Sequence, residues 1–173
     1  SALAGAGCVA SGCGHMNPDR VDDVFSAHPD NWTPVAMDRL VESCREAALW
    51  AEAAGVIFCI ESWVILTLNS PQKMRELADR VNSLLFDPVN LMNLDTYFRN
   101  GDVIREAFDL LGDRIKVVHA KDTILIDSAF TFHMSEAPIG KGRLDYETLL
   151  RCIAELQDEE TPLHIEHLPG IDD

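Results

Sequence analysis

Short apolar segments alternate along this sequence with longer stretches in which apolar residues recur at helical spacing. The short segments are rich in β-branched and aromatic residues, which favour strands, and most of them end in an ionisable residue. Strands that alternate with helices in this way are typical of βα units joined into a parallel sheet. The pattern predicts strands at Val56–Glu61, Leu84–Asp87, Ile115–His119 and Leu163–Glu166, with a weaker candidate at Ala6–Ala10.

Four helices are expected between these strands. Two of them begin at Thr33-Pro34 and Ser70-Pro71, where a side chain that can cap a helix precedes a proline in its first turn. The other two begin at Asp102 and Asp145, each followed by apolar residues at helical spacing. Because no linker or low-complexity segment interrupts this series, we expect one α/β domain over residues 1–173.

The segment from Ala120 to Leu144 breaks the alternation, because it is long for a connection between a strand and a helix. Long connections inside compact domains are usually functional or disordered. Two interpretations remain equally open at this point. The segment is either a flap over a site or an insert that faces a partner.

An ionisable side chain stands at the end of four predicted strands in succession: Glu61, Asp87, His119 and Glu166. Side chains alternate between the two faces of a strand, so the orientation of each can be compared with its neighbours. One polar end alone most often caps the next helix or meets solvent, but four with matching orientation favour a shared site at the carboxyl edge of the sheet. The same inward face is then expected to carry Ile57 and Cys59, Leu85, Ile115 and Val117, and His164.

Three carboxylates and one imidazole form a ligand set for a divalent cation. Hard oxygen ligands with one nitrogen suit Mn²⁺ best among the candidates, with Mg²⁺, Co²⁺ and Zn²⁺ as alternatives. A divalent cation would also offset the repulsion between three neighbouring carboxylates. We therefore predict a metal site made by these four residues.

Charge and cysteine content limit the other function classes. The formal net charge of −15, with 14 basic and 29 acidic residues, argues against a nucleic-acid surface, which needs clustered Lys and Arg. No apolar run approaches the roughly 20 residues that span a membrane. The five scattered cysteines read as small buried residues in a reducing compartment, so we expect a cytoplasmic protein.

Five segments resemble the sugar phosphate isomerase/epimerase family, which belongs to the xylose-isomerase-like TIM barrels of the AP endonuclease family 2 superfamily. These segments are Cys59–Ser62, Leu85–Asn90, Val117–Asp122, Ile139–Gly142 and His164–Glu166. The resemblance runs from about Gly12 to the end of the chain. It implies a (β/α)8 TIM barrel, present here as a partial barrel of about strands 4–8 without the N-terminal strands and the last helix.

The resemblance also implies a function. It suggests a metal-dependent isomerase or epimerase that acts on a small sugar or sugar-like polyol through an enediolate, with Glu61 and Glu166 as the acid/base pair. Asn90, Lys121 and His15 are its candidate substrate-binding residues. No nucleic-acid or membrane partner is expected, and a homo-oligomer of the full-length protein is compatible with this function.

Other functions stay open on the sequence. Ketose 3-epimerases carry a His at the place of Asn90, and a Glu and a later Arg where Lys121 and Asp122 stand, so the substrate need not be a free ketohexose. An inosose-type dehydratase shares the first chemical step. A metal-dependent abasic-site endonuclease and an inactive barrel fragment are the remaining alternatives.

Overall fold

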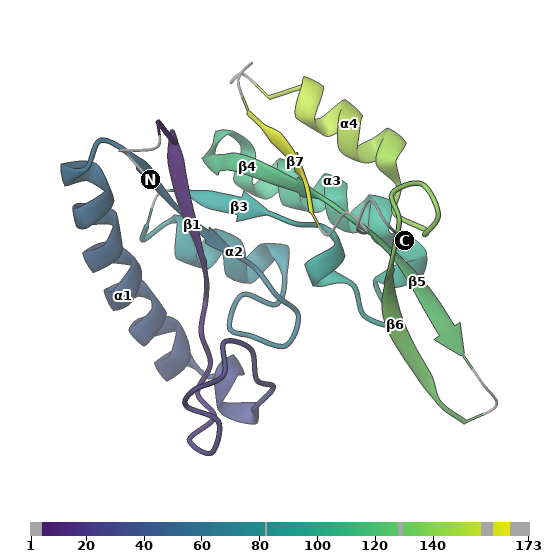
Figure 1. The fold of residues 1–173 in the computed structure, drawn as a ribbon, viewed down its shortest axis with the longest axis horizontal. Coiled ribbons are helices and arrows are strands. Elements are labelled where there is room, and N and C mark those ends of the chain that lie inside the picture. Colours follow the sequence, from purple (N-terminus) through teal and green to yellow (C-terminus); the bar gives the residue numbers. More distant parts are fainter. Residues whose placement is uncertain (1–4, 82, 128–129, 157–160, 167–173) are drawn as a thin grey trace.

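Five parallel strands form one curled sheet, as Figure 1 shows. The computed structural model describes residues 5–81, 83–127, 130–156 and 161–166. The strand order β1-β2-β3-β4-β7 has the β1 and β7 strands at its two edges. The sheet consists of β1 (Cys8–Gly12), β2 (Ile57–Glu61), β3 (Leu84–Phe86), β4 (Ile115–Ala120) and β7 (Leu163–Ile165). This arrangement confirms the predicted partial barrel, although β1 lies two residues later than expected.

Four α-helices connect the strands: α1 (Pro34–Ala53), α2 (Pro71–Ala78), α3 (Asn100–Leu111) and α4 (Tyr146–Ala154). Capping side chains are present at three of the predicted helix starts: Thr33, Ser70 and Asp145. Thr33 Oγ1 accepts a hydrogen bond from the Ala36 amide, and Ser70 Oγ accepts one from the Lys73 amide, each at 3.3 Å. Short 3₁₀ turns cover Pro29–Trp32, Val89–Leu91, Tyr97–Arg99 and Gly112–Arg114.

The α3 helix begins two residues before the predicted Asp102. Gly101 would ordinarily argue against a helix there, because glycine is a poor helix former. Here the Asp145 side chain packs so close that a Cβ on Gly101 would lie 2.4 Å from its carboxylate oxygen Oδ2. Asn100 Oδ1 also accepts a hydrogen bond from the Asp145 amide at 2.7 Å. Contacts with the start of α4 therefore hold this first turn in place.

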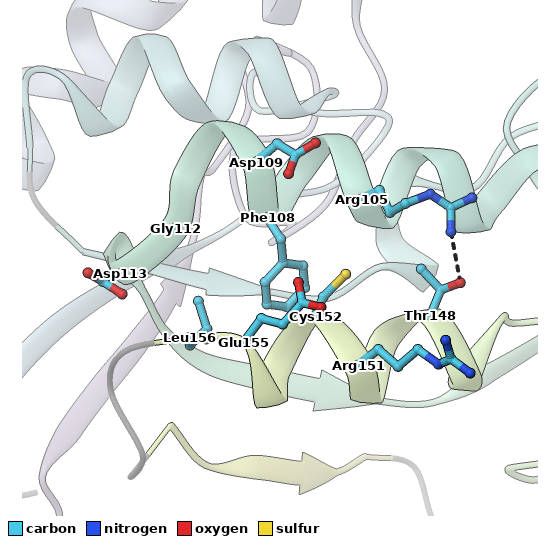
Figure 2. Close-up of a pocket in the computed structure, with 10 residues that line it drawn as sticks. All are labelled: Arg105, Phe108, Asp109, Gly112, Asp113, Thr148, Arg151, Cys152, Glu155 and Leu156. Atoms are coloured by element: carbon cyan, nitrogen blue, oxygen red, sulfur yellow. Dashed lines mark hydrogen bonds between the residues drawn. The ribbon is translucent and has the colours of Figure 1, made fainter.

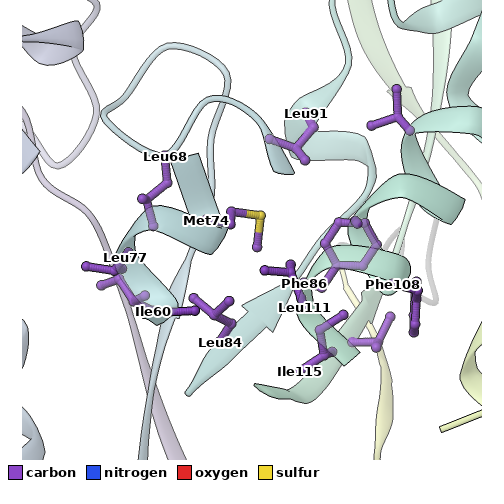
Figure 3. Packing of buried hydrophobic residues seen from close by; sticks show 14 of the residues in the cluster. Ile60, Leu68, Met74, Leu77, Leu84, Phe86, Leu91, Phe108, Leu111 and Ile115 are labelled. Carbon is purple, nitrogen blue, oxygen red and sulfur yellow. The ribbon is translucent and has the colours of Figure 1, made fainter. Parts of the chain in front are cut away.

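The main hydrophobic core lies between the sheet and the helices, and Figure 3 shows its centre. It is largely aliphatic, as the low aromatic content predicts, with Phe86 as its largest fully buried side chain. Phe86 packs edge-to-face on Phe108 of α3, with ring centroids 5.5 Å apart.

All five cysteines are free. None of the helices in the described ranges has both the length and the apolarity that crossing a membrane requires.

The inner face of the sheet carries a smaller apolar cluster of Cys59, Leu85 and Val117, with Cys8 against it. These residues confirm the predicted inward side of their strands. Ile115 does not follow the prediction, because it packs in the core on the helix side. The reason is a register shift between β3 and β4: Leu84 pairs with Ile115, but Leu85 pairs with Val117. The extra residue in β4 reverses the side on which Ile115 lies.

The long segment after β4 is largely a β-hairpin. Its strands β5 (Asp122–Asp127) and β6 (Phe132–Ala137) pair antiparallel and extend away from the main sheet (Figure 1). Several contacts tie β5 to the rest of the chain. Among them, the Leu125 amide donates to the Tyr97 hydroxyl at 3.1 Å, and the Arg143 amide donates to the Thr123 carbonyl at 3.0 Å. Most of the described part of this connection is therefore a pair of strands, which the sequence did not predict.

Asp122 anchors the base of this hairpin. Its carboxylate is 1% exposed and accepts hydrogen bonds from four backbone amides. Oδ1 accepts from Thr123 at 2.9 Å and Leu144 at 3.0 Å, while Oδ2 accepts from Gly140 at 3.0 Å and Gly142 at 2.9 Å. The glycine-rich turn before α4 is thus wrapped around one buried carboxylate.

Candidate metal centre

The four side chains predicted from the strand ends converge at the carboxyl edge of the sheet. Glu61 ends β2, Asp87 follows β3 directly, His119 lies in β4 and Glu166 follows β7 directly. Each offers one potential ligand atom, and these four atoms lie within 4.8 Å of one another. The geometry that the sequence pattern predicts for a metal site is therefore present.

Asp87 is the most buried member of the cluster, with no exposed surface. Its Oδ1 accepts hydrogen bonds from the amides of Val89 at 2.8 Å and Asn90 at 3.2 Å. Its Oδ2 is buried and has no hydrogen-bond partner within the described part of the chain. Burial raises the pKa of Asp87 to about 6, and the neighbouring Lys121 ammonium only partly opposes that shift.

His119 has a second buried polar atom that makes no hydrogen bond within the described part of the chain. Its Nδ1 lies 3.0 Å from Glu166 Oε1 and 3.5 Å from Glu61 Oε1, but neither approach has hydrogen-bond geometry, so the atom lacks a partner among the described residues. Burial lowers the pKa of His119, but the carboxylates of Glu61, Glu166 and Asp87 outweigh it and raise the pKa above its ordinary value.

These two atoms make the cluster fit a metal ion. A buried polar atom without a partner is costly, and natural proteins rarely leave one without a reason. Asp87 Oδ2 and His119 Nδ1 both belong to the group of four converging ligand atoms. A divalent cation among those atoms would give each of them a partner. A third buried polar atom without a hydrogen bond in the described ranges, Ser62 Oγ, belongs to the residue after Glu61.

Two predicted substrate-binding residues contact the cluster itself. Asn90 Nδ2 donates a hydrogen bond to Glu61 Oε1 at 2.7 Å. Lys121 Nζ donates to Glu166 Oε2 at 3.0 Å and also lies 3.0 Å from Asp87 Oδ2. Burial lowers the pKa of Lys121, but the Asp87 and Glu166 carboxylates raise it above its ordinary value. Both side chains contact carboxylates of the cluster, and their direct contact with a substrate stays a prediction.

The third such residue, His15, is engaged elsewhere. Its Nε2 lies 2.9 Å from the Asp23 carbonyl oxygen, and its Nδ1 accepts from the Asn17 amide at 3.1 Å. Both ring nitrogens therefore fix the loop after β1. These contacts favour a structural role for His15, and substrate binding by it remains untested.

An aromatic residue beside the cluster was not predicted. Trp63 lies two residues after Glu61, and the Lys121 ammonium lies 5.2 Å from the centroid of its ring. Phe25 also packs on Trp63, with ring centroids 4.4 Å apart. The signal in the sequence was the position of Trp63, two residues beyond a strand that ends in a predicted metal ligand, Glu61.

The groove between α3 and α4, shown in Figure 2, is separate from this cluster. Two arginines that line it are already paired with neighbouring side chains. Arg105 donates to Thr148 Oγ1 at 3.1 Å and to Asp102 at 2.9 Å, and Arg151 pairs with Glu147 at 2.5 Å. None of the four cluster residues lines it. We therefore place the candidate site at the strand ends.

The sequence model of the xylose isomerase-like TIM barrel family matches residues 6–168. Among curated proteins, none matches this chain significantly.

Several solved structures share the fold. A xylose isomerase-like TIM barrel protein from Mycobacterium smegmatis, in complex with magnesium, has a TM-score of 0.66 and 18% identity, covering 96% of this chain and 56% of that one. A D-tagatose 3-epimerase-like protein has a TM-score of 0.64 and 15% identity, over 93% of this chain and 56% of that one. The apo form of 3-keto-D-glucoside 4-epimerase YcjR from E. coli has a TM-score of 0.58 and 16% identity, over 99% and 60%. This chain thus spans somewhat more than half the length of these structures.

Proposed function

Since this chain belongs to the xylose isomerase-like TIM barrel family, we propose that its cluster binds a divalent metal ion and catalyses isomerisation or epimerisation of a sugar or related polyol. The observation that carries the proposal is the convergence of two buried atoms that make no hydrogen bond among the described residues, Asp87 Oδ2 and His119 Nδ1, with two further carboxylates. Magnesium in one similar structure and the epimerase names of two others agree with it.

The ligand chemistry suits Mn²⁺, Mg²⁺ or Co²⁺, and Zn²⁺ also accepts such ligands. When bound, such an ion would supply Lewis acidity to the oxygens of a substrate. Glu61, Asp87, His119 and Glu166 would hold it. Asp87 is suited to a fixed ligand, because backbone amides already orient its other oxygen.

Glu61 and Glu166 are the proposed acid/base pair. They lie on β2 and just after β7, so the β3 and β4 strands with Asp87 and His119 separate them in the sheet. Two carboxylates placed on either side of one substrate carbon can remove a proton and return it. Each is oriented by a neighbour: Asn90 donates to Glu61 and Lys121 donates to Glu166.

The test is the Glu166→Gln variant of the full-length protein. The amide keeps the size and one ligand oxygen but cannot accept the proton, so turnover should fall roughly 10²-fold or more while much of the metal is retained. The readout is deuterium exchange from solvent into candidate ketoses, beside metal content by mass spectrometry. Glu147→Gln, an exposed residue of α4, is the matched control.

Deuterium exchange at the wild-type rate in metal-loaded Glu166→Gln would reduce Glu166 to a ligand and exclude the two-glutamate mechanism. A dehydratase also begins by removing a proton, so it too would exchange deuterium. It differs from an isomerase because it releases water and an unsaturated product. The abasic-site endonuclease is the less favoured alternative, because the net charge of −15 disfavours binding to a phosphate backbone.

A further inference from the structure

We infer that Lys121 is the built-in counter-cation of the cluster, which holds Asp87 and Glu166 before a metal binds and weakens metal affinity by its charge. This inference rests on the proposed metal site and adds a regulating residue to it. It also gives Lys121 a role that differs from direct binding of a substrate.

The contacts of the ammonium group carry this inference. Lys121 is 3% exposed, so its charge has to be compensated inside the protein. Nζ lies 3.0 Å from Asp87 Oδ2 and 3.0 Å from Glu166 Oε2, and it faces the ring of Trp63. An ammonium has three N–H donors, and these three neighbours surround it. Little of the group is left for a substrate.

One of these contacts involves an atom that the metal would need. Asp87 Oδ1 is taken by two backbone amides, so Oδ2 is the oxygen left for a metal ion. Lys121 Nζ already lies beside that oxygen. A metal ion would therefore share Oδ2 with the ammonium or displace it.

The position of Lys121 along the chain keeps the ammonium near the cluster. It stands between the end of β4 and the start of β5, and its carbonyl oxygen accepts a hydrogen bond from the Tyr146 hydroxyl at 3.0 Å. The next residue, Asp122, is fixed by four backbone amides. On the other side, Ala120 of β4 pairs with Ile165 of β7. Because the backbone is held on both sides, the side chain cannot move away with its segment when a metal binds.

Charge counting gives the direction of the effect. Three ionised carboxylates and a neutral His119 would present a charge of −3, and the Lys121 ammonium reduces it to −2. A divalent ion then neutralises the site. Without the ammonium, the same ion would meet a more negative site and would no longer be repelled by a neighbouring cation.

The experiment compares Mn²⁺ binding to wild type, Lys121→Met and Lys121→Gln in the full-length protein, by calorimetric titration after removal of metal with a chelator. Both variants remove the charge, and Met keeps the length of the apolar stem. We expect each to bind Mn²⁺ at least about 10-fold more tightly, because a unit charge a few ångströms from a divalent ion matters even at high dielectric. Lys73→Met, at a half-buried position of α2, should leave the affinity unchanged.

A second readout separates a counter-cation from a merely structural lysine. The metal-free variants should melt at a lower temperature than metal-free wild type, and Mn²⁺ should raise their melting temperature by more than it raises that of wild type. Equal or weaker Mn²⁺ affinity in folded Lys121→Met and Lys121→Gln would overturn the inference while leaving the metal site intact. A wild type that binds no metal would overturn the proposed function together with the inference.

Discussion

Two buried aspartates at the same edge of the sheet differ in how their oxygens are satisfied. Asp87 is 0% and Asp122 is 1% exposed. The four amides that bind Asp122 occupy both of its oxygens. Asp87 receives two amides on one oxygen, and the other oxygen has no hydrogen bond within the described ranges. The saturated carboxylate holds the chain together, whereas the unsaturated one remains available to a ligand.

The largest effect on stability is expected from Asp122→Ala. It would leave four backbone amides without their acceptor in a buried place, and each such loss is costly. The free energy of unfolding should fall by at least about 3 kcal/mol, a large value for one substitution. Denaturant unfolding in the presence of chelator measures it, and Asp109→Ala on the exposed side of α3 is the control. A loss similar to that of the control would show that Asp122 is not the anchor of the turn.

A smaller loss of stability is expected from Gly142→Ala, which changes the turn that surrounds the Asp122 carboxylate. A Cβ at Gly142 would lie 2.2 Å from Asp122 Oδ1 and 2.5 Å from the Thr123 carbonyl oxygen. Neither atom can give way easily, so unfolding should become easier by about 1–3 kcal/mol, as for other overpacked sites. Gly7→Ala, which has open space around its Cβ, should be close to neutral. Equal stability of the two variants would mean that the turn does not need this close approach.

The smallest effect on the metal-free protein is expected from Asp87→Asn. The amide oxygen can still accept from Val89 and Asn90, and Lys121 keeps its hydrogen bond to Glu166. The Lys121 ammonium therefore still has a carboxylate as its counter-ion, and removal of the buried Asp87 charge offsets part of the lost ion pair. The free energy of unfolding should therefore change by about 1 kcal/mol or less. A loss as large as that of Asp122→Ala, measured in the same chelator buffer, would make Asp87 a structural residue.

The convergence of the four side chains could be predicted from the sequence because it depends on a short-range pattern within each strand. Glu61, Asp87 and Glu166 stand at or just after the end of a strand, and His119 is the last residue but one of β4. Alternation of side chains along a strand is a short-range rule. Cys59, Leu85 and Val117 lie on the inner face as that rule predicts. Ile115 lies on the other face, because β4 has one extra residue relative to β3. That extra residue becomes apparent only when the two strands are paired. Register between strands is a tertiary property, so a periodic pattern could not reveal it.

The hairpin and the anchor could not be predicted in the same way. The β5 and β6 strands pair mainly with each other away from the core, so several of their apolar residues are exposed, among them Ile126 and Phe132. Their sequence therefore lacks the clear alternation of a half-buried strand. The hydrogen bonds of Asp122 to Gly140, Gly142 and Leu144 span 18 to 22 residues, which no local spacing rule covers.

The central claim is that the unsaturated cluster, and not the saturated anchor, binds a divalent ion. Calorimetric titration of chelator-treated protein with Mn²⁺ tests it most directly, on wild type, Asp87→Asn and the control Asp109→Asn. We predict one ion bound per chain for wild type and for the control, and an affinity at least roughly 100-fold lower for Asp87→Asn, because a ligand with a full charge is lost. Absence of Mn²⁺ binding to wild type, or unchanged affinity in Asp87→Asn, would contradict the account.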